Sequence, residues 1–437
     1  METKFIAGVI VALIIGILIG YGISATMAPP APTPTGTAPA PAGLSGEVKI
    51  GALLTLTGDL ASYGENSRAA IELAEQEVND WLNAIGEDWT LKVVIEDTAT
   101  DPKTAADKIR TLHGQGIKIV VGPMTSAEVS EIKEYINANE ILVVSQSSTS
   151  PALSIPGDFI YRYCPDDTIQ GPAAARVLFD LGVRYVIPVW RGDTWGDGVE
   201  EETKVAFMNI LQKEGAEGDW HEGIRYAPGA KEFSTEAALL NDYVTDWVNK
   251  YGKDKVGIYY VGFDEAAAFV SAAKDYDILR EIVWVGSDGT AGVTTLVDEP
   301  DAAAFSWDVR WLHPIFAPTE NPKYFRLRDY VVNKLGREPD AYAYAAYDAV
   351  WTIAIALEMV QEYNPVKIRD ILPEVVKFYM GASGHFELNE NGDRAYADYT
   401  LMIVKKTDGA YEWDVAGIWR YTTDSIEWYE WFKPYLP

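Results

Sequence analysis

The chain has 437 residues, of which 48% are hydrophobic; this excludes a disordered polypeptide and predicts large buried cores, most simply in two domains. The formal net charge of −29 gives an acidic surface that repels nucleic acid, so we expect no nucleic-acid partner. We attribute this acidity to solubility rather than to a basic partner. Cys164 is the only cysteine, so no disulfide within the chain is possible.

The N-terminus carries an uncharged apolar run at residues 5–23, close to the roughly 20 residues that a helix needs to cross a bilayer. Because Thr26-Met27-Ala28 offers a small-residue cleavage site, residues 1–27 are expected to be either a membrane anchor or a removed signal peptide. Residues 28–43 are rich in Pro, Thr and Ala and favour extended polyproline II. They are expected to form a stiff linker, or alternatively a leader without a spacing role.

From Val48 onward, short β-branched runs alternate with amphipathic stretches. Nearly continuous apolar runs are typical of parallel strands that are covered on both faces, and repeated strand–helix units predict doubly wound α/β sheets. The expected strands are Val48–Leu56, Leu91–Glu96, Ile117–Val121, Ile141–Ser145, Tyr185–Trp190, Val256–Val261 and Ile282–Val285. The expected helices are Glu65–Trp81, Thr104–Leu112, Ala127–Asn137, Gly198–Lys213 and Glu265–Asp275.

The C-terminal part has a different pattern. Helices are expected at 342–360 and 366–379. After them, His385–Leu388, 396–405 and 411–421 have the pattern of antiparallel strands, and Asn391-Gly392 is the strongest hairpin signal.

Polar, small or aromatic residues follow the carboxyl ends of six expected strands, three early in the chain and three later. Open α/β sheets bind ligands beyond this edge, which predicts two sheets facing each other over one cleft. Trp195 and Phe263 lie beside glycines and are expected in loops, where a large ring is more often a contact surface than a core residue. The candidate residues are Tyr63, Ser126, Ser147, Thr149, Trp195, Phe263 and Asp288.

The segment 125–128 (Thr-Ser-Ala-Glu) has capping-box spacing and predicts a helix start, where free N–H groups favour a carboxylate. The alternative is that Ser126 only caps the helix. Ser147 and Thr149 precede Pro151 and are equally expected as turn or cap residues.

Common enzyme motifs are missing: the sequence has no phosphate-binding P-loop, no Gly-x-Ser-x-Gly elbow and no His-Glu-x-x-His helix. The four histidines lack metal-ligand spacing. The segment 389–393 alternates like a calcium loop but lacks the distal Glu, so a hairpin turn explains it better. We therefore expect no enzyme activity, no cofactor and no metal.

Seven stretches of the sequence stand out through their order and spacing. They are 50–58 (Ile-Gly-Ala-Leu-Leu-Thr-Leu-Thr-Gly), 63–64 (Tyr-Gly), 97–102 (Asp-Thr-Ala-Thr-Asp-Pro), 119–122 (Ile-Val-Val-Gly), 147–153 (Ser-Ser-Thr-Ser-Pro-Ala-Leu), 259–262 (Tyr-Tyr-Val-Gly) and 384–393 (Gly-His-Phe-Glu-Leu-Asn-Glu-Asn-Gly-Asp). Together they resemble the substrate-binding proteins of branched-chain amino-acid ABC transporters. The resemblance runs from about Val48 to Tyr421, and the order and spacing of the stretches carry it rather than any single one.

The resemblance implies the type I periplasmic-binding fold, with two doubly wound lobes joined by a three-stranded hinge. Lobe one would comprise 44–167 and 309–385, and lobe two 168–308 and 386–437. The family pattern implies that hydroxyls of lobe one hold the ligand carboxylate, that an acid of lobe two holds the ammonium, and that aromatic rings cover the ligand. The hydroxyls that would hold the carboxylate are those of Ser126, Ser147 and Thr149, and the acid that would hold the ammonium is Asp288. The rings that would cover the ligand are Tyr63, Trp195 and Phe263.

By the same resemblance, the protein would be extracytoplasmic, would bind an amino acid, and would work with ABC permease and ATPase subunits while its N-terminal segment contacts the membrane. A membrane-anchored sensor of the same fold, or a binder of amides or urea, is the alternative. Trp195 and Phe263 stand where tyrosine is frequent, and Ser147 where alanine is common. These departures reshape the pocket and leave open which branched-chain or related amino acid is bound.

Overall fold

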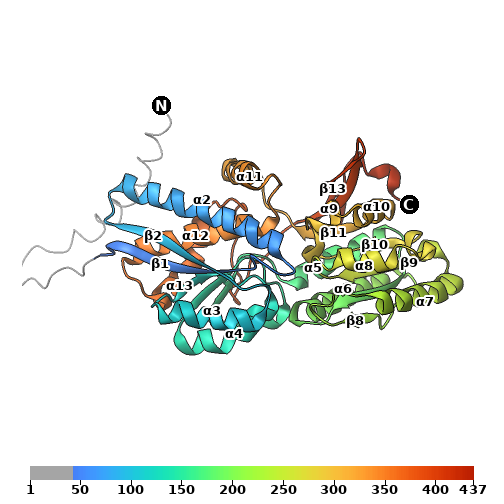
Figure 1. Ribbon diagram of the computed structural model, residues 1–437, viewed down its shortest axis with the longest axis horizontal. Coiled ribbons are helices and arrows are strands. Elements are labelled where there is room, and N and C mark those ends of the chain that lie inside the picture. Colours follow the sequence, from blue (N-terminus) through green and yellow to red (C-terminus); the bar gives the residue numbers. More distant parts are fainter. Residues whose placement is uncertain (1–42) are drawn as a thin grey trace, which may run out of the picture. The chain divides into compact units, whose positions relative to one another are not determined.

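The computed structural model describes residues 43–437, which form one compact unit. The expected anchor or signal at 1–27 and nearly all of the linker at 28–43 lie outside the described residues. In the described part, the strands form two separate sheets, each with its own helices (Figure 1). This arrangement confirms the predicted α/β fold with two doubly wound lobes.

The first lobe is built on a sheet of five parallel strands. In spatial order they are β2 (Trp89–Asp97), β1 (Gly46–Leu54), β3 (Ile119–Val121), β4 (Leu142–Ser145) and β5 (Ile160–Arg162). The helices of this lobe are α2 (Ala61–Ile85), α3 (Pro102–Gly114), α4 (Ser126–Asn139), α11 (Pro322–Leu335), α12 (Ala341–Val360) and α13 (Pro365–Phe378).

Both faces of this sheet are buried. Ile50 and Leu54 of β1 pack into the core that contains α2 and α12, while Leu53 faces the core with α3 and α4. Strands covered on both sides explain the unbroken Val and Ile runs of the sequence. Among the described residues, α12 is long and apolar enough to cross a membrane, but most of it is buried, as in a core helix.

The second lobe is built on a sheet of nine strands, parallel from β6 to β11 and antiparallel from β11 to β14. The strands are β6 (Tyr185–Arg191), β7 (Asp219–Trp220), β8 (Ile224–Tyr226), β9 (Val256–Val261), β10 (Val283–Val285), β11 (Leu312–Phe316), β12 (Tyr399–Thr407), β13 (Ala410–Arg420) and β14 (Ser425–Trp428). The helices are α5 (Asp167–Asp180), α6 (Thr194–Glu214), α7 (Ser234–Tyr251), α8 (Ala266–Ala273), α9 (Thr295–Asp298) and α10 (Pro300–Asp308).

The described chain passes between the lobes three times: from β5 to α5, from β11 to α11, and from α13 to β12. The second crossing differs from the expected boundary, because residues 312–316 form β11 between β10 and β12 instead of belonging to lobe one. His313 and Pro314 interrupt this short apolar run, and a proline cannot donate a ladder hydrogen bond. The strand is therefore hard to recognise in the sequence.

The C-terminal hairpin turns at a different place from the one expected. Asn391-Gly392 lies in a tight turn, but a single bridge between Leu388 and Arg394 flanks it, and no strand forms at His385–Leu388. The hairpin between β12 and β13 turns at Asp408-Gly409. Both of these residues have positive φ, as a two-residue hairpin turn requires.

Candidate functional site

Helix α4 begins as the capping-box spacing predicts. The Thr125 hydroxyl accepts from Glu128 N at 3.2 Å, and the Glu128 carboxylate accepts from Thr125 N at 2.9 Å, so Thr125 is the N-cap. The buried Ser126 hydroxyl instead accepts from the N–H groups of Thr149 at 3.1 Å and Ser150 at 3.0 Å. Neither of these two hydrogen bonds uses the proton of the Ser126 hydroxyl, so among the described residues Ser126 keeps a hydrogen-bond donor for a ligand.

The other two hydroxyls predicted to hold a carboxylate differ from each other. Ser147 donates to the Met124 carbonyl at 2.7 Å, so its proton is engaged within the first lobe. Thr149 Oγ1 is buried and has no hydrogen-bond partner among the described residues. Buried polar atoms in folded proteins are normally paired, so Thr149 and Ser126 mark a place that suits a polar ligand group.

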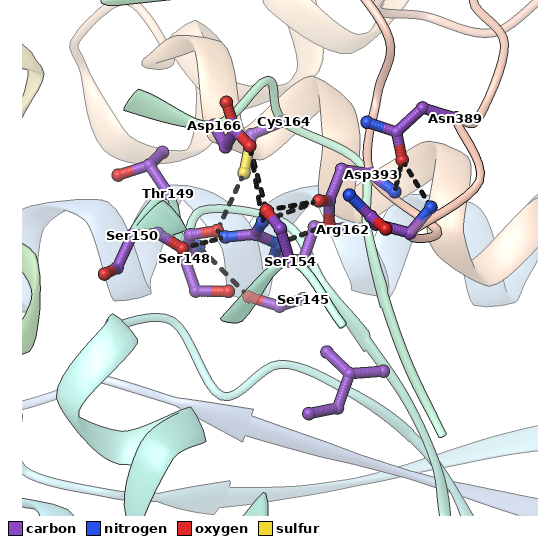
Figure 2. A network of polar contacts seen from close by, with 12 residues as sticks. Ser145, Ser148, Thr149, Ser150, Ser154, Arg162, Cys164, Asp166, Asn389 and Asp393 are labelled. Atoms are coloured by element: carbon purple, nitrogen blue, oxygen red, sulfur yellow. Dashed lines mark hydrogen bonds and ion pairs between the residues drawn. The ribbon is translucent and has the colours of Figure 1, made fainter. Parts of the chain in front are cut away.

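Arg162 supports the loop at residues 145–150 by hydrogen bonds to two of its backbone carbonyls (Figure 2). Its Nη1 donates to the carbonyl of Ser148 at 3.1 Å and to that of Ser150 at 2.7 Å. Its Nε and Nη2 donate to the two carboxylate oxygens of Asp393. This buried two-point ion pair fixes the loop that carries Thr149, and sequence reasoning missed Arg162 because its partner lies 231 residues away.

The segment 389–393, whose sequence alternates like a calcium-binding loop, forms a turn in this network (Figure 2). The Asn389 side-chain oxygen accepts from Asn391 N at 2.9 Å and from Asp393 N at 3.0 Å, which closes the turn. The turn presents the Asp393 carboxylate to Arg162.

Asp288 lies in the second lobe at the start of a short 3-10 helix (η4, Asp288–Thr290), three residues after the end of β10 at Val285. Tyr342 of α12 donates to its Oδ2, while its Oδ1 is buried and has no partner among the described residues. Tyr63 of α2 donates to the Asp288 carbonyl at 2.8 Å and also to the Ala291 carbonyl. Because both tyrosines come from the first lobe, the two lobes meet at Asp288.

Asp167, the first residue of α5, is a buried acid that sequence reasoning did not select. Its N–H donates to the Thr149 carbonyl at 2.9 Å, and its Oδ1 accepts from Gln170 at 2.7 Å. Burial, and then the charge of Asp288, raise the pKa of Asp167 well above its ordinary value. Burial likewise raises the pKa of Asp288, to about 6. Two neighbouring buried carboxyls of this kind favour a positively charged ligand group beside them.

Two aromatic rings lie against the same short helix. Trp195 and Phe263 stack with their ring centroids 4.6 Å apart. A Cβ at Gly289 would lie 2.6 Å from the Trp195 ring and 2.7 Å from the Phe263 ring, so both rings contact the residue next to Asp288. Phe263 lies in a loop as expected, whereas Trp195 lies in the first turn of α6.

The structure therefore arranges the candidate residues in two groups. The first-lobe group has the hydroxyls of Ser126 and Thr149, and the second-lobe group has Asp288 with its aromatic neighbours. Ser150 joins the lobes by donating from Oγ to the Thr194 carbonyl at 2.9 Å, and Asp167 lies between Thr149 and Asp288. Ser147 belongs to the same loop, but its hydroxyl proton is already used.

Two α/β lobes, three crossings and polar groups that meet between the sheets define a two-lobe binding protein. Residues 47–410 match the periplasmic binding protein family, and the chain belongs to that family. Its members are extracytoplasmic proteins that bind small-molecule ligands, and this membership confirms the resemblance seen in the sequence.

Individual relatives agree with this assignment. An uncharacterized protein of Methanocaldococcus jannaschii is 32% identical over 403 residues, which cover 87% of this chain and 91% of the relative. The Leu/Ile/Val-binding protein homolog 1 of Brucella abortus is 27% identical over 375 residues, which cover 84% of this chain and 93% of that relative. The crystal structure of the leucine binding protein LivK of Thermotoga maritima shares the fold with a TM-score of 0.69 at 22% identity, covering 84% of this chain and 97% of that one.

Proposed function

We propose that this chain is the substrate-binding component of an ABC transporter and that it binds a branched-chain or related amino acid between its two lobes. The names of the similar Leu/Ile/Val-binding and leucine binding proteins support this ligand class. The ligand residues in this proposal are Tyr63, Ser126, Ser147, Thr149, Asp167, Trp195, Phe263 and Asp288.

One observation carries the proposal: hydrogen-bond donors and acids lie on opposite sides of the junction between the lobes. Ser126 retains a free donor and Thr149 an unpaired hydroxyl, while Asp167 and Asp288 each keep one buried carboxylate oxygen without a partner among the described residues. A zwitterion satisfies both sides, because its carboxylate needs donors and its ammonium needs carboxylates. An apolar ligand would leave all of these groups unpaired.

The remaining ligand surface is aromatic. Trp195 and Phe263 present a stacked pair beside Gly289, and Tyr63 reaches across from the first lobe to the Asp288 carbonyl. Rings in this position cover an aliphatic side chain and exclude water from it. This surface favours Leu, Ile or Val over small polar amino acids.

Transport would need partners. The sequence has no phosphate-binding P-loop, so in this proposal separate permease and ATPase subunits supply the pathway and the energy. The apolar segment 5–23, outside the described residues, would hold the protein at the membrane as an anchor or direct its export as a signal.

A thermal-shift screen of the full chain over the twenty amino acids, urea and short amides tests the ligand class. Saturating Leu, Ile or Val should raise the melting temperature by several degrees, because a ligand that binds only the folded state stabilises it. D-Leucine is the matched control, and it should give a much smaller shift. A shift with urea or amides alone would assign the site to those ligands, and no shift with any of the compounds would refute the proposal.

A further inference from the structure

A single acid of the first lobe, Asp59, contacts three elements of the second lobe. It lies in the loop between β1 and α2. Its Oδ2 lies 3.0 Å from Arg191 Nη1, its Oδ1 lies 2.7 Å from Lys231 Nζ, and its carbonyl accepts from Asp264 N at 3.2 Å. Arg191 ends β6, Lys231 precedes α7, and Asp264 follows β9. Three contacts from one loop residue make Asp59 a bridge between the lobes.

The two ion pairs differ in their surroundings. The side chains of Asp59 and Arg191 are 13% and 6% exposed, whereas that of Lys231 is 70% exposed. Burial acts to raise the pKa of the Asp59 carboxyl, but hydrogen bonds from Lys231 and Arg191 outweigh it and hold the pKa below its ordinary value. Asp59 is therefore ionised near neutral pH. Because exposed ion pairs contribute little, the pair with Arg191 is the effective one.

Arg191 does not depend on Asp59 for its charge balance. Within the second lobe it already pairs with Asp193 at 2.6 Å and with Glu265 at 2.9 Å. If the lobes separate, Arg191 therefore keeps two carboxylates, and Asp59 and Lys231 pass into water. The loss of one partner normally leaves a buried charge without compensation, but here neither lobe would keep a buried, unpaired charge.

The same arginine touches the aromatic pair of the candidate site. Its guanidinium carbon lies 4.5 Å from the centre of the Phe263 ring, and Phe263 stacks on Trp195. Four residues after Asp59 comes Tyr63, which donates to the Asp288 carbonyl. Both ends of the Asp59 contact thus lie next to residues that would cover the ligand.

We infer that Asp59 is a positioning residue that latches the two lobes together, and that its pair with Arg191 sets how much of the protein is closed. This inference rests on the proposed function only in that closure encloses the ligand. The contacts of the latch are made only between residues of this chain, so its test needs no ligand.

The test measures the distance between the lobes in the ligand-free, full-length protein. Spin labels are attached to cysteines introduced at the exposed positions Glu131 of α4 and Glu201 of α6, two helices that contact each other across the lobes, while the buried Cys164 stays unlabelled. Distance distributions from double electron–electron resonance then give the ratio of open to closed molecules.

We expect Asp59→Asn to raise the open-to-closed ratio roughly tenfold, because it removes the charge of a largely buried pair. Lys231→Gln should change the ratio no more than about twofold, and 1 M salt, where the Debye length is about 3 Å, should reproduce that small change in the wild type. Asp59→Glu should restore the wild-type ratio.

The matched control is Asp80→Asn, which makes the same charge change at an exposed position of α2. Unchanged melting temperatures would show that all variants are folded. Identical distance distributions for the wild type and Asp59→Asn would overturn the inference, as would an equal shift in Asp80→Asn or a wild type without a closed population. A wild type that binds no amino acid but shows the expected ratios would overturn only the proposed function.

Discussion

Asp288 is the residue on which ligand selectivity most depends in this account. Replacing it by Asn keeps its size but removes the charge that would hold an ammonium. We expect Asp288→Asn to weaken leucine binding by at least about 30-fold, the usual consequence of breaking a buried charge pair. Isothermal titration calorimetry measures this loss. Asp246→Asn, at an exposed position of α7, is the control and should bind leucine like the wild type; equal affinities for wild type and Asp288→Asn would show that the ammonium lies elsewhere.

The raised pKa values of Asp167 and Asp288 predict how binding depends on pH. A ligand ammonium pairs with the ionised carboxylate, so affinity should be highest above about pH 7 and should fall as the pH drops through 6, the pKa of Asp288. In Asp288→Asn the affinity should fall less steeply over this range. Calorimetric titrations from pH 5 to pH 8 check this, and affinity that is constant or rises toward pH 5 would contradict it.

The free energy of unfolding of the ligand-free protein should fall as the pH rises, whereas the affinity for the ligand should rise. The pKa of Asp288 is about 6 in the folded state against an ordinary value of 3.8, so between these values the folded state binds more protons than the unfolded state. Its contribution to the free energy of unfolding is therefore lost as pH rises through this window. Above about pH 6, Asp288 is therefore in the charged form that would bind an ammonium, and this charge lowers the free energy of unfolding.

Sequence reasoning identified some site residues and not others for a physical reason. Ser126 and Asp288 are the first residues of helices that follow strands of the two sheets within a few residues, so their place at a sheet edge can be inferred locally. Asp167 and Tyr342 acquire their roles from partners on other elements: Tyr342 donates to a residue 54 positions away, and Asp167 is influenced by the charge of Asp288. No local pattern reveals such pairs.

At the scale of the elements, the loop at 145–150 depends on a turn from the far end of the chain. Asp393→Asn would remove the nearest carboxylate of the buried Arg162 and leave only Asp166, whose Oδ2 lies 3.9 Å from Arg162 Nη2. Breaking a buried ion pair in this way costs about 3–5 kcal/mol of unfolding free energy. Leucine binding should weaken as well, because Arg162 positions the carbonyls of Ser148 and Ser150. Urea unfolding and calorimetry measure the two effects.

The matched control lies on the same turn. Glu390 is exposed, and Glu390→Gln should change neither the stability nor the affinity. A loss below 1 kcal/mol in Asp393→Asn would mean that the ion pair does not support the loop.

The elements themselves were predictable where the sequence pattern is uninterrupted. Each strand expected between residues 48 and 285 is present within a few residues of its expected bounds. The helix α5 and the strand β11 were not among the expected elements, and each contains a proline, Pro172 and Pro314, that interrupts the local pattern. The helix α7 and the short strands β5, β7, β8 and β14 were not among them either, although they contain no proline. Packing against neighbouring elements forms α5 and β11 despite the proline, which only the three-dimensional structure shows.

At the scale of the whole molecule, three crossings join two lobes that contact each other through a few specific groups. Tyr63 and Tyr342 meet Asp288, Ser150 meets Thr194, and Asp59 meets Arg191. Hinge closure can bring such groups around one small molecule without rebuilding either sheet. Apart from the boundary at β11, the expected division into lobes stays a prediction, and so does the ligand role of each candidate residue.

The central claim is that one lobe binds the carboxylate of an amino acid and the other binds its ammonium. Calorimetric titration of the wild type with leucine, leucinamide and 2-hydroxy-4-methylpentanoate tests both ends, since the two analogues lack the carboxylate and the ammonium respectively. We predict tight binding of leucine and a loss of at least about 30-fold for each analogue, because each leaves buried polar groups unpaired. Binding of either analogue as tightly as leucine would contradict the claim.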